Sequence, residues 1–181
     1  NKAAVLLVLS SHIGVVKDAI EEVEQALSEA QDPYSDILDD DLDGDEPRGN
    51  QDTYWSEQDR RVIGPCQGLM KASAASLRKL TSAVRAKGDV TTHQNLAQLD
   101  DLADITKDIS PSVDDLALCL YPPMDYSGVE SNASKLAALL KKVLEIISHV
   151  CGESELSWVQ FLEGAVDHNL QKARDLIQQG S

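Results

Sequence analysis

Apolar residues near the start of the chain recur in alternating steps of three and four. A helix has 3.6 residues per turn, so this spacing places them on one face and predicts an amphipathic helix packed at a near-parallel angle. We expect this helix to begin after Asn1, a good N-cap, and to stop at Asp32-Pro33, because the residue before a proline avoids helical geometry. The stripe consists of Leu6, Leu9, Ile13, Val16, Ile20, Val23 and Leu27.

The same spacing returns in four later parts of the chain. Each repeats apolar residues every three or four positions for several turns, which is the pattern of a helix with one buried face. No segment alternates apolar and polar residues with a period of two, so no strand is predicted. The four segments are residues 56–88, 96–120, 129–150 and 159–177.

Prolines divide two of these segments. Gly64-Pro65 is expected to interrupt the second helix, whose main part then begins at Pro65. Ser110-Pro111 is expected to kink or break the third helix, because proline removes one backbone hydrogen bond. The predicted fold is an all-α bundle of about five long antiparallel helices.

We interpret residues 1–181 as a single helical-bundle domain, with residues 32–55 as an acidic mobile linker between the first and second helices. Seven of the eleven residues from 36 to 46 are acidic, and they repel one another. Because the chain starts at Asn1 without methionine, we also expect it to be part of a longer protein.

The acidic linker contains the first half of an EF-hand calcium loop. Asp39, Asp41, Asp43 and Gly44 occupy its first, third, fifth and sixth positions. A working loop needs a bidentate glutamate at the twelfth position, and Asn50 stands there instead. Calcium binding by this acidic loop is therefore kept only as a remote alternative.

Charge and composition narrow the function classes. A net charge of −15 opposes general affinity for nucleic acid or anionic lipid, so neither is expected as a partner. No apolar run is expected to reach the ~20 residues of a membrane span. Cys66, Cys119 and Cys151 form no CxxC pair, which argues against a zinc site or a disulfide framework and favours a reducing compartment.

Catalytic signatures are not found in the sequence. There is no Gly-x-Ser-x-Gly motif, no phosphate-binding glycine loop and no paired Glu-x-x-His motif of a di-metal bundle. Glu145 and His149 lie one helical turn apart, which is more typical of a helix-stabilising contact. We predict a non-enzymatic protein without metal or cofactor.

One basic segment contrasts with the acidic chain. Seven basic residues and no acidic one lie between Arg60 and Lys87. Lys71, Arg78 and Arg85 recur every seven residues and so share a helical face. They form either a solvated face that tempers the surrounding negative charge or a docking site for the acidic linker or an acidic partner.

Two serines are candidate phosphorylation sites. Ser110 precedes a proline, and Ser112 precedes Asp114 and Asp115, which are proline-directed and acidic-directed patterns respectively. Both serines also suit an N-cap of the following helix, and a phosphate there would be opposed by the two aspartates.

Three stretches carry a family resemblance: the opening "NKAAVLLVLS…VVKDAIEEVEQA…DPYS", "NQDTYWSEQDRRVIGPC" and "SPSVDDLALCLYPPM". Together they resemble the C-terminal half of the cyclin-D-binding protein family, also called GCIP or Maid-like proteins. The resemblance implies an all-α, non-enzymatic regulator of the cell cycle in nucleus and cytoplasm. It implies binding to D-type cyclins, with restraint of cyclin-dependent kinase activity and of retinoblastoma-linked transcription.

The same resemblance implies two further partners, a haematopoietic adaptor protein and helix-loop-helix transcription factors, the latter expected mainly through the absent N-terminal half. Arg78-Lys-Leu80 and Arg174-Asp-Leu176 match an Arg-x-Leu cyclin-docking pattern, but both lie in predicted helices, so a helical surface is the expected contact. The alternative from another class is a vinculin- or talin-like helical scaffold without a specific cyclin role, which rests on fold analogy alone.

Overall fold

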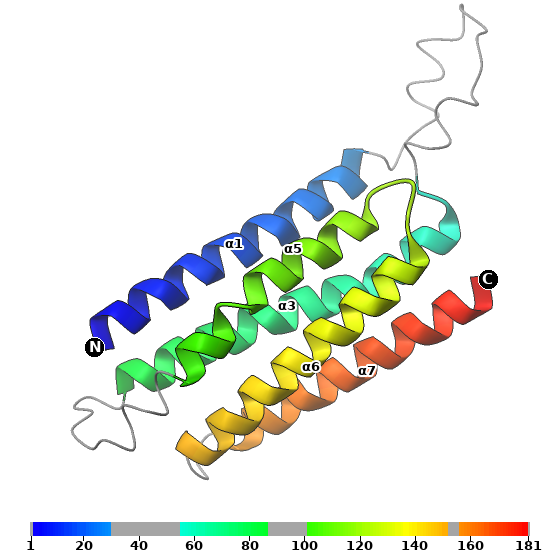
Figure 1. Ribbon diagram of the computed structural model, residues 1–181. Coiled ribbons are helices and arrows are strands. Elements are labelled where there is room, and N and C mark those ends of the chain that lie inside the picture. Colours follow the sequence, from blue (N-terminus) through cyan, green and yellow to red (C-terminus); the bar gives the residue numbers. More distant parts are fainter. Residues whose placement is uncertain (1, 30–54, 87–100, 152–155, 181) are drawn as a thin grey trace, which may run out of the picture.

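The structure is a computed structural model that describes residues 2–29, 55–86, 101–151 and 156–180. Within these ranges the chain forms five helices and no strand, as the apolar spacing predicts (Figure 1). A shorter helical stretch over 101–106 precedes the third of them. The helices are α1 (Lys2–Glu29), α3 (Glu57–Ala86), α5 (Ile109–Leu120), α6 (Tyr126–Cys151) and α7 (Leu156–Gly180).

Consecutive helices run in opposite directions, which confirms the predicted antiparallel bundle (Figure 1). Helix α3 packs against α1, α5, α6 and α7, so it is the central element. Helix α1 packs mainly on α3 and α5, whereas α7 packs mainly on α3 and α6. The position of α3 determines which of its residues remain accessible to a partner.

The core consists mainly of aliphatic side chains from all five helices. Their burial removes apolar surface from water and is the main favourable term in folding. The predicted stripes supply these residues, and Leu80, which belongs to one Arg-x-Leu pattern, is only 1% exposed. The largest side chains with essentially no exposure are Leu9, Ile63, Leu69, Met70, Leu77, Leu80, Ile109, Leu116, Leu120, Leu136, Leu140 and Leu144.

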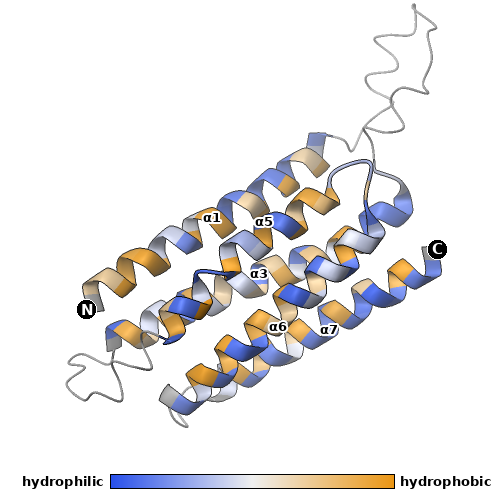
Figure 2. Cartoon of the chain, viewed as in Figure 1, coloured by the Kyte–Doolittle hydropathy of each residue, from blue (hydrophilic) through white to orange (hydrophobic). Residues whose placement is uncertain are grey.

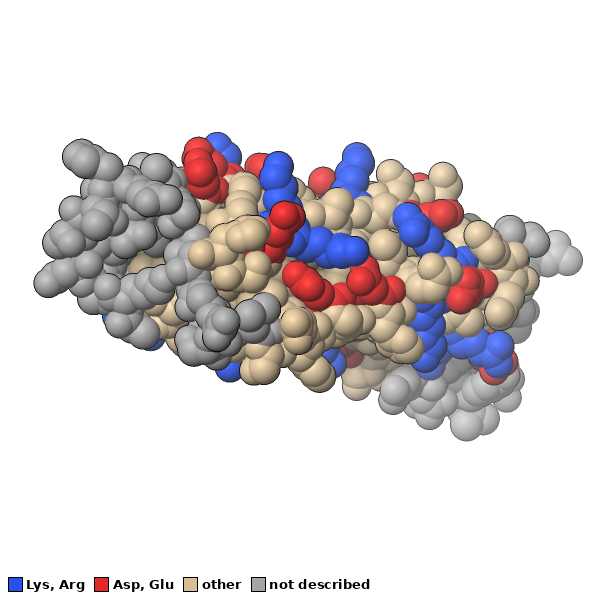
Figure 3. All heavy atoms as spheres, turned by 90° about the horizontal axis from the view of Figure 1, so that it is seen from below, with Lys and Arg blue, Asp and Glu red and all other residues tan. Residues whose placement is uncertain are grey.

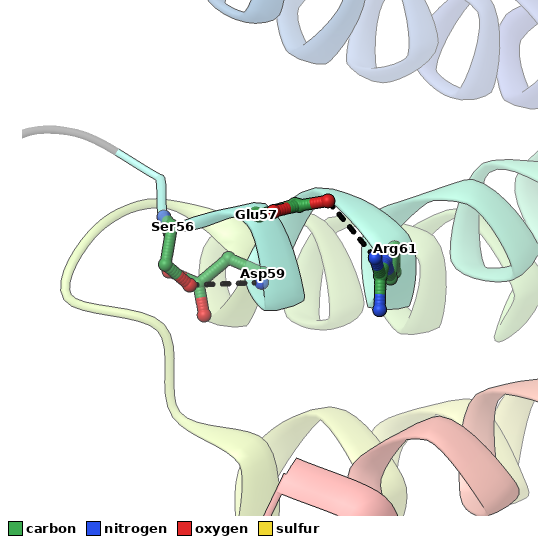
Figure 4. A network of polar contacts seen from close by, with 4 residues as sticks. All are labelled: Ser56, Glu57, Asp59 and Arg61. Carbon is green, nitrogen blue, oxygen red and sulfur yellow. Dashed lines mark hydrogen bonds and ion pairs between the residues drawn. The ribbon is translucent and has the colours of Figure 1, made fainter.

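Helix α3 begins with a reciprocal cap. The Ser56 hydroxyl accepts a hydrogen bond from the Asp59 backbone N–H at 3.0 Å, and the Asp59 carboxylate accepts one from the Ser56 N–H at 3.0 Å (Figure 4). These bonds satisfy backbone groups that a helix start leaves unpaired. The helix start expected at Ser56 is therefore confirmed, with aspartate in the place usually held by glutamate.

Trp55 lies just before this cap and is buried. Its indole N–H donates a hydrogen bond to the Leu120 carbonyl at 2.5 Å, and its ring lies 6.2 Å from that of Tyr121. The start of α3 is thereby fastened to the end of α5. Trp55 is the one residue of the expected linker, 32–55, that the structure describes; the rest of that segment, and with it the half EF-hand loop, lies outside the described residues.

The predicted interruption at Gly64-Pro65 is wrong, because α3 continues through it for 30 residues. Proline inside a helix removes the hydrogen bond to the carbonyl four residues earlier and costs about 3 kcal/mol. Here Val62, Ile63 and Cys66 beside the proline are at most 1% exposed. Each such burial contributes about 1.5–3 kcal/mol, so tertiary packing outweighs the local break.

The predicted break near Ser110-Pro111 is confirmed, and it falls slightly earlier. Helical residues 101–106 end at a turn over Lys107 and Asp108, and α5 then starts at Ile109. Pro111 thus occupies the first turn of the new helix, where its missing N–H costs little. The expected N-cap role of Ser110 is wrong: Asp108 holds that position, without a side-chain cap bond, and both serines lie inside α5.

Helix α1 departs from one expectation. Over Ala3–Glu29 it is long and apolar enough to cross a membrane by length and composition, whereas no segment was expected to approach that length. Length and composition alone do not separate a membrane span from a helix packed on other helices. In this structure its face with Leu9, Val16 and Val23 is buried, within the contact that it makes with α3 and α5.

Candidate functional site

Helix α3 leaves one narrow face uncovered, which we call the outer strip. Its residues follow one another at steps of three and four and are exposed or half-buried. From Arg61 onward the strip contains only basic and small side chains, and the exposed Glu57 precedes Arg61 by one turn. The outer strip consists of Arg61, Gly64, Gly68, Lys71, Ala75, Arg78, Ser82 and Arg85.

The three basic residues expected to contact a partner all lie on the outer strip and are exposed. The Lys71 ammonium lies 3.3 Å from the Glu24 carboxylate of α1. Both side chains are largely exposed, and such a pair contributes at most about 1 kcal/mol. A partner could therefore replace Glu24 at small cost. Partner binding by Lys71, Arg78 and Arg85 stays a prediction.

Residues of α1 and α7 border the outer strip. On the α1 side stands Glu24, and on the α7 side the Lys79 ammonium lies 5.9 Å from the centre of the Trp158 ring. A cation over an aromatic face is attracted by the ring's negative charge distribution. Both contacts lie at the surface, beside the packed core. Figure 3 shows one face of the molecule, on which basic and acidic side chains are interspersed.

An open depression of about 470 Å³ lies between the first half of α3 and the second half of α7. Its lining contains two guanidinium groups, an ammonium, an imidazole and an amide, and no carboxylate. This local excess of cationic groups contrasts with the net charge of −15 of the whole chain. The lining residues are Arg60, Arg61, Gly64, Pro65, His168, Asn169, Lys172 and Leu176.

Glycines on α3 shape this region. Gly64 is exposed, and a Cβ atom there would meet no other atom within 4 Å, so the missing side chain leaves open space. One turn later, a Cβ on Gly68 would overlap the Asn169 amide, because α3 and α7 approach closely at that point. The Asn169 amide is itself held by a bond of 2.8 Å to the Ala165 carbonyl.

Ion pairs within the lining are weak. Arg61 lies 2.9 Å from Glu57, one turn earlier on the same helix, with both side chains more than half exposed (Figure 4). Such a pair is worth a few tenths of a kcal/mol. Arg60 takes part in an interaction of its own. Among the described residues, the side chains of His168 and Lys172 form neither a hydrogen bond nor an ion pair.

The structure separates the two candidate phosphorylation sites. Ser110 is 5% exposed, and its hydroxyl lies 2.7 Å from Nδ1 of His12 on α1. Ser112 is half-buried. A kinase needs an accessible hydroxyl, so in this conformation Ser110 is shielded by α1 while Ser112 is partly accessible. Whether either is modified stays a prediction.

The geometry and burial of the described residues bear on metal binding and on the ionisation of thiol and phenol groups. They contain no group of three or more His, Cys, Asp or Glu side chains that could hold a metal. Burial, with a smaller effect of Cys119, raises the pKa of the Cys66 thiol to about 12, so Cys66 is not a thiolate nucleophile near neutral pH. Burial and the hydrogen bond that the Tyr126 hydroxyl donates to Asp59 raise the pKa of Tyr126 to about 12.

Sequence reasoning missed the depression and the role of Trp55. His168 and Lys172 lie more than 100 positions after Arg61, and no one-dimensional pattern links them. A signal was present for Trp55, since aromatic side chains contribute much to core packing and a hydrophobic residue directly before an N-cap often packs against its helix. From the sequence, Gly64 was interpreted only as part of a helix interruption, and the open space beside it was not predicted.

Comparison with known proteins adds the family. The family described as "Grap2 and cyclin-D-interacting, C-terminal" matches residues 38–145, more than half of the chain. "Cyclin-D1-binding protein 1 homolog" of Danio rerio is 61% identical over 100% of this chain and 53% of its own length. The homolog of Xenopus laevis is 57% identical over 98% of this chain and 54% of its own length.

"Cyclin-D1-binding protein 1" of Homo sapiens is 44% identical over 98% of this chain and 52% of its own length. The chain thus spans about half the length of the curated relatives it matches. The family description names interactions with other proteins rather than a reaction. Matching on more than half of its residues, this chain belongs to the family of Grap2 and cyclin-D-interacting proteins, in the part described as C-terminal.

Proposed function

We propose that this chain binds a D-type cyclin through the outer strip of α3. The observation that carries the proposal is its similarity, over nearly its whole length, to proteins named for binding cyclin D1. The outer strip is the favoured contact because Lys71, Arg78 and Arg85 are exposed and lie outside the core. Arginine is enriched among residues that contribute most to protein interfaces.

Through this contact the protein restrains cyclin-dependent kinase activity and retinoblastoma-linked transcription, acting as a negative regulator of the cell cycle in nucleus and cytoplasm. A haematopoietic adaptor protein and helix-loop-helix transcription factors are further proposed partners of the complete protein. The part of the relatives that this chain does not cover is the proposed site for the helix-loop-helix factors. These roles follow from the family resemblance and concern the complete protein.

Calorimetric titration of the 181-residue chain with a D-type cyclin at physiological salt tests the proposal. Saturable binding is expected. Reversing all three charges (Lys71→Glu, Arg78→Glu, Arg85→Glu) should weaken it by about tenfold or more, because charges that complement a partner would then repel it. Repeating the titration with calcium tests the acidic loop.

The matched control reverses Lys17, Lys135 and Lys142, which are exposed on α1 and α6. It changes the net charge equally and should leave cyclin affinity within about twofold. A loss of affinity in the first variant can then be attributed to the position of its three residues and not to the change in net charge. Absence of binding by a folded chain would contradict the proposal for this part of the protein and favour the scaffold alternative.

A further inference from the structure

Four residues that line the open depression between α3 and α7 lie outside the hydrophobic core. They are Arg61 and Gly64 from one helix and His168 and Lys172 from the other. The lining holds several cationic groups and no carboxylate in a chain of net charge −15, and Arg61 pairs with Glu57 only through exposed side chains. The arrangement therefore calls for an anionic ligand.

The charges in the lining favour a ligand with more than one negative charge. Lys172 and His168 are without a partner among the described side chains, and Arg61 holds only the exposed Glu57. An arginine presents a planar fork of donors that matches phosphate oxygens, and lysine adds a point charge. A phosphate carries about −1.5 to −2 charges near neutral pH and three acceptor oxygens, which suits this donor set better than a single carboxylate.

The rest of the molecule limits what can deliver the phosphate. A net charge of −15 repels extended polyanions such as nucleic acid and anionic membranes, which spread charge over a wide surface. A single phosphate on an otherwise uncharged segment meets only the local basic lining. The depression is open to solvent and continues into the outer strip at Arg61 and Gly64, so a peptide can lie across it.

We propose that the depression formed by Arg61, Gly64, His168 and Lys172 binds a phosphorylated serine or threonine in a segment of a protein partner. The phosphate lies over the open space at Gly64, where donors from α3 and α7 converge. This goes beyond the cyclin proposal, because the site recognises a modification and would serve any partner that carries it.

Two substitutions should impair binding in the depression without impairing folding. Gly64→Leu places bulk in the depression, at an exposed helical position where a Cβ atom meets nothing within 4 Å, so the chain should fold. Lys172→Gln removes one charge and keeps most of the side chain. The controls are Gly14→Leu on α1, which also meets nothing within 4 Å, and Lys142→Gln on α6, which is exposed.

The probe is a fluorescent peptide mixture with one fixed phosphoserine and degenerate flanks, measured by anisotropy against the 181-residue chain. Lys172→Gln should weaken its binding by about tenfold, the size expected for losing one charged hydrogen bond. Gly64→Leu should weaken it by about tenfold or more, because the added side chain fills the space proposed for the phosphate. Lys172→Arg should restore affinity, and both controls should leave it unchanged. Circular dichroism on every variant confirms that it is folded.

Several results would overturn the proposal. They are no binding of the phosphorylated mixture, equal binding of the same mixture with serine or glutamate at the fixed position, and an affinity that Gly64→Leu does not change. Binding only to phosphatidylserine vesicles would assign the depression to a lipid headgroup instead. No cyclin is present in these assays, so failure here is separate from failure of the cyclin proposal.

Discussion

Helices α1 and α3 are nearly equal in length and opposite in character. From Ala3 to Val16, α1 has no Asp, Glu, Lys or Arg, whereas α3 carries charged residues at both ends and in its middle. Yet α1 places four side chains in the described core and α3 places eleven. In Figure 2 the first turns of α1 are mostly hydrophobic although they lie at the edge of the bundle.

The difference shows that position in the bundle, and not apolar content, decides what a helix contributes. Helix α3 has neighbours on nearly every side, so even its small residues Ala72, Ala74 and Ser76 are at most 5% exposed. Helix α1 has principal neighbours on one side only, and Leu7 remains 72% exposed. A very apolar helix can therefore be the one that detaches from the bundle with the smallest loss of buried side chains.

The largest effect is expected from truncating the centre of α3. Leu77 has no exposed surface, so Leu77→Ala should lower the free energy of unfolding by about 2–5 kcal/mol through lost burial and the cavity left behind. Val16→Ala on α1 also removes fully buried methyl groups, but should cost about 2 kcal/mol and act locally.

Urea unfolding gives the two free energies, and hydrogen exchange shows where they act. Leu77→Ala should speed exchange throughout the described helices, and Val16→Ala mainly in α1. Equal acceleration in all helices for both variants would show that α1 is as tightly coupled to the core as α3, which would contradict the comparison.

A medium effect is expected at the polar link between α1 and α5. His12→Leu leaves the buried Ser110 hydroxyl without its partner and should cost about 1–3 kcal/mol. The double variant His12→Leu with Ser110→Ala should regain part of this loss, because no polar group then remains unsatisfied. A double-mutant cycle of thermal unfolding measures the coupling, and additive effects would show that the bond stabilises nothing.

The smallest effect is expected on the outer face of α1. Leu7→Gln should change the free energy of unfolding by less than about 0.5 kcal/mol, since Leu7 contacts mostly solvent. Urea unfolding of Leu7→Gln beside the unchanged chain measures this difference. A large destabilisation would mean that this face packs against residues other than those described.

Most of the fold could be predicted from the sequence because helix spacing is a local property. The stripe from Leu6 to Leu27 and the cap at Ser56 each depend on residues close together along the chain. The same reasoning failed at Pro65. The rule that proline breaks a helix considers one residue, whereas the burial of Ile63 and Cys66 depends on four neighbouring helices.

The candidate site was predicted only in part. Lys71, Arg78 and Arg85 share a face because of their spacing, and the structure exposes all three. Lys172 lies beside Arg61 and Gly64 only because α7 returns beside α3, and 98 positions separate His12 from Ser110. Contacts between residues so far apart leave no trace in a single sequence.

The bond between His12 and Ser110 also has a consequence for timing. A kinase can reach Ser110 only in a molecule whose helix α1 has already detached, since the hydroxyl is covered while α1 is in place. A phosphate added at that moment would be too large and too charged to fit back under His12. Phosphorylation of Ser110 would thus keep α1 displaced after the opening that allowed it, until a phosphatase removes the phosphate.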